Sequence, residues 1–583
     1  MLKTLRHRPE AVFALVLLWK AALLVFTAQP IPANDSFFYD GAVVNLLVQG
    51  RYCNPAIANA LPISGHEIFS AYPPLYQLTL LGWMRVAGPS VLSAMWLHFL
   101  LFALYAALVL ATLRELRIPV LATHLAGLFL LGLTFHDRPD SLAHVLGMAA
   151  IYAVARALRP PSELAAAGSE ETSQSPLDIG NDACGRGATT RWHWLAAAGV
   201  ILCLGTSLQI GGVYFLLIWL VILLCWRLPA SWLSLGVPSG AGLSRTPRQE
   251  LEMRIHPARY NPFPGGFPWP ALVVMSLVPV ALALGVKYLW PQLWAGFQEH
   301  AQQTPSLTAW RKPELTEVIK ILRTVPGLLV ALALVTFSVL AVFRRRDRVS
   351  ALTQLDMRQQ AVLLAGCVAA AAVLVGALFF LTANIVLITA YLQPLVVGLF
   401  LALWTSAVTL RRKTVVLNLG FGLAVLLAST RAIGLTTIGW ICARDVSRGE
   451  ALTAVARELA VTPNGSPVAV SAAYLYDAWP EARRLQLLHT DWLGPAVKGK
   501  PNAEMDALRA VKPARLILTQ FDYHRRYARV LGQLQSASSQ VGVRVENLAR
   551  VRPPDASPRW QRVVQHVSWA PVLVTLEWDE PTR

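Results

Sequence analysis

Two carboxylates open the first polar segment of the chain. Asp35 and Asp40 follow the first apolar run, residues 11–28, in a segment too polar and too broken to cross a membrane. A carboxylate placed beside a bound acceptor can take up its proton as a general base. The competing interpretation of Asp35 is an N-cap for the helix that follows it. For Asp40 the competing interpretation is a solvated helix face.

A second acidic turn reads His136-Asp137-Arg138-Pro139-Asp140 and separates the apolar runs 118–135 and 141–158. Asp140 and His144 are one helical turn apart and share a face. Asp35, Asp137 and Asp140 together could bind a divalent cation through their oxygens. The alternative for Asp140 is a helix cap favoured by the helix dipole.

The composition indicates that these turns belong to an integral membrane protein. Of the 583 residues, 55% are hydrophobic and 14% are charged, an apolar excess that a soluble protein of this length could not bury. The net charge of +18 lies mostly in short loops between apolar runs, as membrane orientation requires. No nucleic-acid-binding motif accompanies it, so we expect no nucleic-acid partner. Lys20, inside the first run, is expected to face other helices.

The spacing of the apolar runs predicts about eleven membrane spans over residues 1–434, with the N-terminus in the cytoplasm. Residues 29–90 and 291–324 are then external loops, and the short run 75–86 is expected to lie in the membrane interface.

Residues 435–583 alternate short β-rich runs with helical stretches, which predicts a small extracytoplasmic α/β domain. The strands are expected at 467–470, 514–519 and 571–576, and helices at 451–459 and 523–534. The predicted fold is therefore an all-α polytopic protein of the cell membrane, with a C-terminal α/β domain.

Two further side chains are candidates for binding a ligand. Arg311 and Lys312 lie in the second external loop, against the positive-inside pattern, and either bind a lipid phosphate or snorkel to the headgroups. Two other side chains have a structural interpretation from the sequence alone: Gln209 would bond across helices, and Tyr391 would belong to the interfacial aromatic belt.

These motifs follow one another in a specific order. The first external loop carries, in sequence, Asp35, Ala42, Leu46, Gly50, Tyr52, Pro73, Pro74 and Leu75. Arg138-Pro139-Asp140 and Tyr391-Leu-Gln-Pro394 come later. This order resembles that of the membrane glycosyltransferases with the GT-C fold, the superfamily of aminoarabinose and protein-mannosyl transferases that use polyprenyl-phosphate sugars.

The chain departs from that family at three places. Ser36 follows Asp35 where many relatives have Glu, and Ala390 precedes Tyr391 where they have Arg. Relatives that modify lipid A carry Glu-Lys where this chain has Ala71-Tyr72.

The resemblance implies transfer of a sugar from a polyprenyl-phosphate donor to a glycan, lipid or protein acceptor at the extracytoplasmic face. Asp35 and Asp40 are the catalytic candidates that it implies. The donor- or phosphate-binding candidates are Arg138, Asp140, Gln209, Arg311, Lys312 and Tyr391. Family members differ in metal use, so a divalent cation stays open and no other cofactor is expected.

Two other classes of function compete with this one. A membrane transporter predicts paired half-repeats and a binding site at the bilayer midplane. A non-catalytic scaffold predicts that the external domain binds a partner and that Asp35 is dispensable. The chain instead concentrates its polar groups in external loops and has one asymmetric external domain.

Overall fold

The computed structural model describes most of the first 157 residues and most of the C-terminal segment. The described ranges are 8–32, 36–71, 74–132, 140–157, 284–285, 287–303, 446–494, 503–537, 541–548 and 568–578, with short pieces between 197 and 201 and between 358 and 442.

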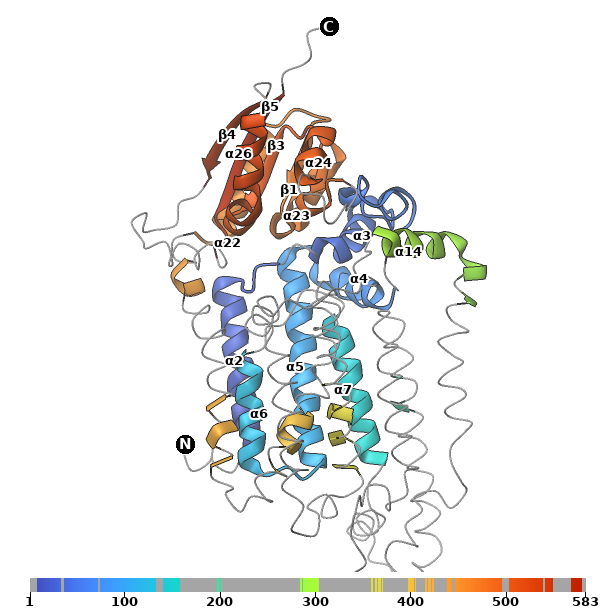
Figure 1. Cartoon of the computed structure of the whole chain (residues 1–583), viewed down its shortest axis with the longest axis vertical. Helices are drawn as coiled ribbons and strands as arrows, with labels where there is room; N and C mark the ends of the chain where they lie inside the picture. The colour runs from blue at the N-terminus through green and yellow to red at the C-terminus, as the bar shows by residue number, and fades with distance from the viewer. Residues whose placement is uncertain are drawn as a thin grey trace, which may run out of the picture.

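Four helices of the N-terminal part run side by side (Figure 1). They are α2 (Pro9–Thr27), α5 (Val91–Glu115), α6 (Val120–Gly132) and α7 (Asp140–Ala157). Proline in the first turn favours the start of α2, because its missing N–H would have no helical partner there. Ser90 caps α5 by accepting a hydrogen bond from the Ser93 N–H at 3.2 Å.

Two of the described helices, α2 and α5, are long and apolar enough to cross a membrane, and two shorter apolar helices cover Val120–Leu131 and Ser141–Ala157. These four lie where the sequence predicts the first spans. The other predicted spans fall mainly outside the described residues, so the count of about eleven stays a prediction.

Polar side chains join these helices at two levels. Lys20 is buried in α2 and donates to the Leu131 carbonyl of α6 at 3.2 Å, with its ammonium 5.0 Å from the centre of the Phe102 ring. The expectation that Lys20 faces the other helices is therefore confirmed. At the end of α5, Glu115 pairs with the buried Arg358 at 3.1 Å and with Arg156 at 3.3 Å.

The first loop packs across the upper end of these helices (Figure 1). Its elements are α3 (Ser36–Gln49), the short turns η1 (Pro55–Ile57) and η2 (Ile63–Glu67), and α4 (Leu75–Ala87). Asn54 ties the loop together, because its side-chain amide donates to the carbonyls of Phe37 (2.9 Å) and Phe38 (3.2 Å). The run 75–86, predicted to be a short interfacial segment, is the short helix α4.

A helix from far along the chain, α14 (Pro291–Gln303), packs against this loop. Glu299 Oε1 accepts a hydrogen bond from the Ile63 N–H at 3.4 Å. A Cβ on Gly296 would overlap Ser70 Oγ and lie 3.0 Å from Ser70 Cβ. Any larger residue at this position would require Ser70 to shift, so glycine favours the close approach of α14 to the loop.

The C-terminal segment forms a five-stranded mixed sheet with helices, which we call the α/β unit (residues 446–578, as far as described). Its strands are β1 (Pro467–Val470), β2 (Gln486–His489), β3 (Arg515–Thr519), β4 (Val541–Asn547) and β5 (Pro571–Trp578). The order is β2-β1-β3-β5-β4, with β1, β2 and β3 parallel and β5 antiparallel to both β3 and β4.

The connections of the α/β unit are mostly helical. They are α22 (Arg448–Ala460), α23 (Ala472–Ala478), η6 (Trp479–Arg483), η7 (Thr490–Trp492), α24 (Ala503–Val511), α25 (Gln520–Asp522), η8 (Tyr523–Tyr527) and α26 (Ala528–Ala537). The three predicted strands and both predicted helical stretches are present. The sequence did not predict β2 or β4: β2 has no β-branched residue, and β4 is interrupted by Gly542 and Arg544.

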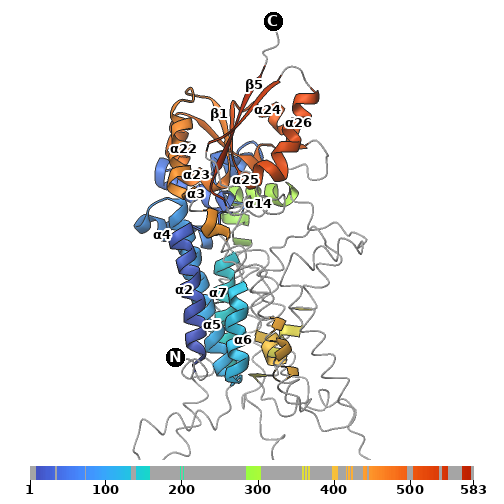
Figure 2. The ribbon, with the colours of Figure 1, turned by 90° about the vertical axis from the view of Figure 1, so that its left-hand side faces the viewer.

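The carboxyl ends of β1, β2 and β3 face the upper end of the helices (Figure 2). The residues that follow them are Ser471, Thr490 and Gln520, and the last residue of β3, Thr519, pairs with Pro571 at the start of β5. The chain passes from β1 to β2 on one side and then to β3 on the other. Such a reversal makes a topological switch point at the carboxyl ends of β1 and β3, the place where doubly wound sheets commonly bind ligands.

Candidate functional site

Asp40 lies at the centre of a buried group of hydrogen-bonding side chains. Its side chain is 0% exposed within α3. Tyr76 donates its hydroxyl proton to Oδ1 at 2.8 Å, and Tyr476 donates to Oδ2 at 2.7 Å. The interpretation of Asp40 as part of a solvated helix face is therefore wrong, because the α/β unit and α4 close over this face of α3.

The group continues into the helices through His98. Its Nε2 is 3.0 Å from the Tyr76 hydroxyl, and its Nδ1 is 3.2 Å from the Ser141 hydroxyl. Because the Tyr76 proton is donated to Asp40, Nε2 carries a proton and donates to the Tyr76 oxygen. A neutral His98 then accepts at Nδ1 from Ser141. We call Tyr476, Asp40, Tyr76, His98 and Ser141 the tyrosine–histidine network.

This network connects five elements: α3, α4, α5 and α7 of the N-terminal part, and α23 of the α/β unit. Two of its members, Asp40 and Ser141, lie near the starts of α3 and α7. The helix α3 begins one residue after Asp35, and α7 begins at Asp140, directly before Ser141. The two turns therefore adjoin helix starts at the same end of the bundle.

Most of the candidate side chains named from the sequence lie outside the described residues. These are Asp35, Asp137, Arg138, Gln209, Arg311, Lys312 and Tyr391. Asp140 is described as the first residue of α7, without its side chain. Their roles in catalysis and donor binding stay predictions.

Metal binding is likewise a prediction. Over the described residues, no group of three or more His, Cys, Asp or Glu side chains is arranged to bind a metal ion. The proposed ligands Asp35, Asp137 and Asp140 are not among the side chains that this statement covers.

Aromatic side chains fasten the α/β unit to α3. The Phe37 ring contacts Tyr476 edge-on at 5.0 Å and Trp479 at 5.1 Å between centroids. The Trp479 indole N–H donates to Asn45 Oδ1 at 3.2 Å. Offset and edge-to-face aromatic pairs add to the free energy of burying the same area, so this contact is both apolar and directional.

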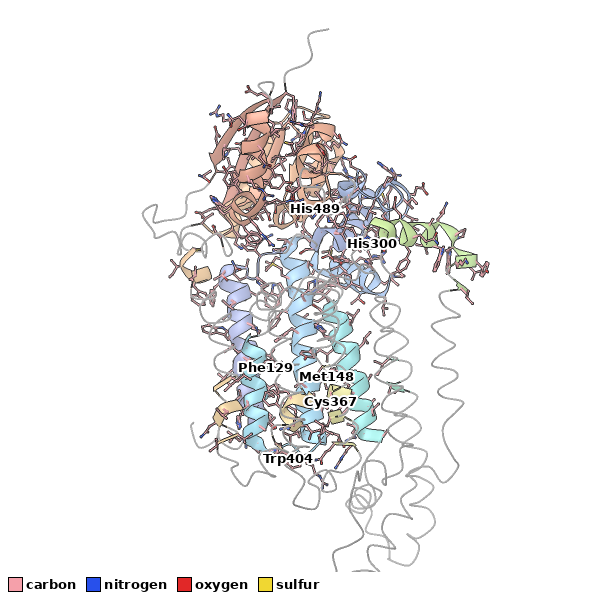
Figure 3. All side chains as sticks on the ribbon, viewed as in Figure 1. Phe129, Met148, His300, Cys367, Trp404 and His489 are labelled. Carbon is pink, nitrogen blue, oxygen red and sulfur yellow. The ribbon has the colours of Figure 1, made fainter. Side chains whose placement is uncertain are left out.

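A second aromatic contact joins three segments. Phe38 of α3 stacks on Trp492 of η7 at 4.4 Å, and His300 of α14 lies 5.4 Å from the Phe38 ring. His300 and His489, the last residue of β2, mark this junction in Figure 3. The first loop, α14 and the α/β unit thus meet at one place.

The α/β unit also contacts the helix ends directly. Trp569 donates its indole N–H to the Thr27 carbonyl at the end of α2 at 3.2 Å. Asp477 pairs with Arg448 at 3.0 Å and accepts the backbone N–H of Val91 at the start of α5. Burial raises the pKa of Asp477, while Arg448 and the Val91 hydrogen bond act in the opposite direction.

Tyr76, His98, Tyr476 and Trp479 were not among the candidates from the sequence. One signal could have identified His98, since an ionisable side chain within an apolar span marks a functional or paired residue. Tyr76 directly follows the Pro-Pro-Leu motif. Nothing in the local pattern around Tyr476 indicates that it contacts α3.

Comparison with protein-family models gives no match, and no curated protein matches the sequence. Among solved structures, the chain is similar to the apo oligosaccharyltransferase of Archaeoglobus fulgidus, with a TM-score of 0.46 and 11% identity over 92% of this chain and 73% of that one. It is also similar to that organism's oligosaccharyltransferase AglB in complex with an inhibitory peptide and a dolichol-phosphate (TM-score 0.46, 11% identity, 92% and 72% covered).

A third similar structure is ArnT from Cupriavidus metallidurans bound to undecaprenyl phosphate, with a TM-score of 0.34 and 14% identity over 98% of this chain and 99% of that one. These similar structures are an oligosaccharyltransferase and ArnT, as their descriptions state. Their low TM-scores and identities assign neither residue roles nor an activity to this chain.

Proposed function

We propose that this chain is an integral-membrane glycosyltransferase. It would move a sugar from a polyprenyl-phosphate donor to a glycan, lipid or protein acceptor at the extracytoplasmic face of the cell membrane, with Asp35 as the general base. The observation that carries the proposal is the tyrosine–histidine network, which links the start of α3 to the start of α7. The two acidic turns adjoin those two helix starts.

The chemistry of this transfer needs groups of opposite charge near one another. Positive charge develops at the anomeric carbon and negative charge on the departing phosphate, while the acceptor loses a proton. A carboxylate beside the acceptor and fixed cations beside the phosphate lower the barrier. Asp35 would be the carboxylate beside the acceptor. Arg138, with Asp140 in the same turn, would supply the contacts to the donor.

The second external loop supports the same arrangement. The helix α14 packs on the first loop through Glu299 and Gly296, and its last residue, Gln303, is followed eight positions later by Arg311. Arg311 and Lys312 would then bind the lipid phosphate, with Gln209 and Tyr391 as further donor contacts. Asp40 is proposed to act by its position, because tyrosine hydroxyls occupy both of its oxygens.

The direct test is turnover by the purified full-length protein in lipid nanodiscs, supplied with radiolabelled polyprenyl-phosphate sugars. We expect Asp35→Asn to lower turnover by about 10²- to 10⁴-fold, the usual contribution of a general base. Asp506→Asn, at an exposed position of α24, is the matched control and should keep full turnover.

The outcomes separate the parts of the proposal. An absence of wild-type turnover with every donor would refute the proposed enzymatic activity. Donor movement across the bilayer without transfer would favour a transporter. Equal turnover by Asp35→Asn and wild type would refute the role of Asp35 as general base. Loss of turnover on chelation, with recovery on adding Mg²⁺, would support a divalent cation at Asp35, Asp137 and Asp140.

A further inference from the structure

The edge of the sheet at which doubly wound folds commonly bind a ligand is covered here by the chain itself. In such folds the crevice lies beyond the carboxyl ends of the parallel strands, where the strand order reverses. In the α/β unit, α23 follows β1 and packs on α3, and η7 follows β2 and stacks Trp492 on Phe38. Trp569, next to the end of β3, contacts the end of α2.

The contact between α23 and α3 is polar as well as apolar. Tyr476 and Trp479, both almost fully buried, donate to Asp40 and to Asn45, which lie five positions apart on α3. Hydrogen bonds to an ionised carboxylate are shorter and stronger than neutral ones. The α/β unit therefore restrains both the rotation of α3 about its axis and its shift along that axis.

The restraint extends beyond α3. Tyr76 joins Asp40 to His98 in α5, and His98 joins Ser141 in the first turn of α7. Every link is between buried side chains, at 2.7 to 3.2 Å. A change at Tyr476 would therefore be transmitted to Ser141 at the start of α7, the residue directly after Asp140.

We propose that Tyr476, Tyr76 and His98 are positioning residues, through which the α/β unit keeps the helix starts beside Asp35 and Asp140 in register. Its effect on turnover rests on the proposed function, whereas the physical coupling does not. The α/β unit would thus act as an intramolecular clamp on α3.

The central variant is Tyr476→Phe, which removes one hydroxyl and leaves the ring against Phe37. We expect kcat for sugar transfer to fall about 10- to 100-fold, the cost of misplacing reacting groups by a fraction of an ångström to an ångström. The KM for the donor should change much less. Tyr474→Phe is the matched control: Tyr474 lies on the same helix and is equally buried, but its hydroxyl donates to the Trp569 carbonyl within the α/β unit at 2.7 Å.

A pair of variants at His98 tests the inner part of the network. His98→Leu removes both hydrogen bonds and should lower kcat as Tyr476→Phe does. His98→Gln keeps a donor near the position of Nε2 and should recover part of the loss. The double variant Tyr476→Phe with His98→Leu should be no worse than the more damaging single variant, because both break one network.

A second readout does not depend on activity. Cys53 is 1% exposed, and its sulfur accepts a hydrogen bond from the Asn45 side-chain amide. The Asn45 Oδ1 atom in turn accepts a hydrogen bond from the Trp479 indole N–H. Labelling of Cys53 by a thiol reagent, followed by peptide mass spectrometry, therefore reports release of α3. We expect Tyr476→Phe to speed this labelling about tenfold through more frequent local opening, and Tyr474→Phe to leave it unchanged.

Lower kcat and faster Cys53 labelling in Tyr476→Phe, with Tyr474→Phe like wild type, would support the clamp. Wild-type kcat and labelling in Tyr476→Phe would overturn it. If the wild type shows no turnover, the proposed function fails, and Cys53 labelling still decides the clamp. Equal effects of Tyr476→Phe and Tyr474→Phe would also overturn it, because general loosening of the α/β unit would then explain both.

Discussion

Tyr476 donates a 2.7 Å hydrogen bond to Asp40 across 436 positions of the sequence. Both side chains are at most 1% exposed, so this carboxylate is removed from water only when the C-terminal α/β unit packs on α3. The contact makes a residue of the first loop depend on the far end of the chain. The surroundings of Asp40 therefore exist only in the intact protein.

Asp40→Asn is expected to destabilise the protein by about 1.5–3 kcal/mol, the range for losing a hydrogen bond to a charged group. The new amide nitrogen would face a tyrosine hydroxyl that now donates to a carboxylate oxygen. The thermal unfolding midpoint in detergent, followed by tryptophan fluorescence, measures this loss. Asp506→Asn should stay within about 0.5 kcal/mol of wild type, as exposed substitutions usually do. An unchanged midpoint in Asp40→Asn would contradict the network.

Gly296→Ala should destabilise the contact between α14 and the first loop. The added methyl would overlap Ser70 Oγ and lie 3.3 Å from Ile63 Cγ2, an overpacking that costs about 1–3 kcal/mol. Gly82→Ala in α4 is the control, because a Cβ there meets nothing within 4 Å and should stabilise the helix by about 0.5–1 kcal/mol.

Unfolding midpoints of these two glycine variants give the comparison. Adding Ser70→Ala removes the nearest overlapping atom and should recover part of the Gly296→Ala loss. If both glycine variants shifted the midpoint upwards, the close approach of α14 would be refuted.

Glu115→Gln should be among the most damaging single changes in the helices. Glu115 and Arg358 are almost fully buried and 3.1 Å apart, so the substitution leaves a buried guanidinium without its counter-charge. Breaking such a pair costs about 3–5 kcal/mol. Arg156→Gln should cost less than about 1 kcal/mol, since Arg156 is 31% exposed and Glu115 keeps Arg358. Equal losses of stability in the two variants would count against this difference.

Alkaline pH should destabilise the α/β unit through its buried tyrosines. Burial raises the pKa of Tyr527, whose hydroxyl donates to the Thr490 carbonyl at 2.6 Å, and burial with the Asp522 charge raises that of Tyr474. An unfolded tyrosine ionises near pH 10, so the folded state holds more protons above that pH. The stabilising contribution is complete below about pH 10 and is lost as pH rises toward the raised folded pKa.

Above about pH 11 the free energy of unfolding should therefore fall by about 1.4 kcal/mol per pH unit for each such tyrosine, with a shallower slope near pH 10. Free energies of unfolding between about pH 9 and 12 measure this dependence. Tyr527→Phe should remove one tyrosine's share of it. A slope that Tyr527→Phe leaves intact would show that Tyr527 ionises equally in both states.

Local patterns in the sequence determined the elements that periodicity and turn chemistry control. The apolar runs at 11–28 and 91–113 correspond to α2 and α5, because a continuous apolar run has one stable backbone in a membrane, the helix. The β-rich runs at 467–470 and 571–576 correspond to β1 and β5. The helices α3 and α7 begin after polar breaks that the same patterns located, since a polar break between apolar runs marks where the chain turns.

Only the tertiary structure decided what α3 contacts. Asp40 fits a solvated helix face as well as a buried one, and the hydroxyl of Tyr476 gives no local sign of its acceptor. The partners in the tyrosine–histidine network are separated by 22, 36, 43 and 436 positions. Pairings at such distances depend on how whole elements pack, because the burial of a carboxylate is favourable only where donors from other elements arrive together.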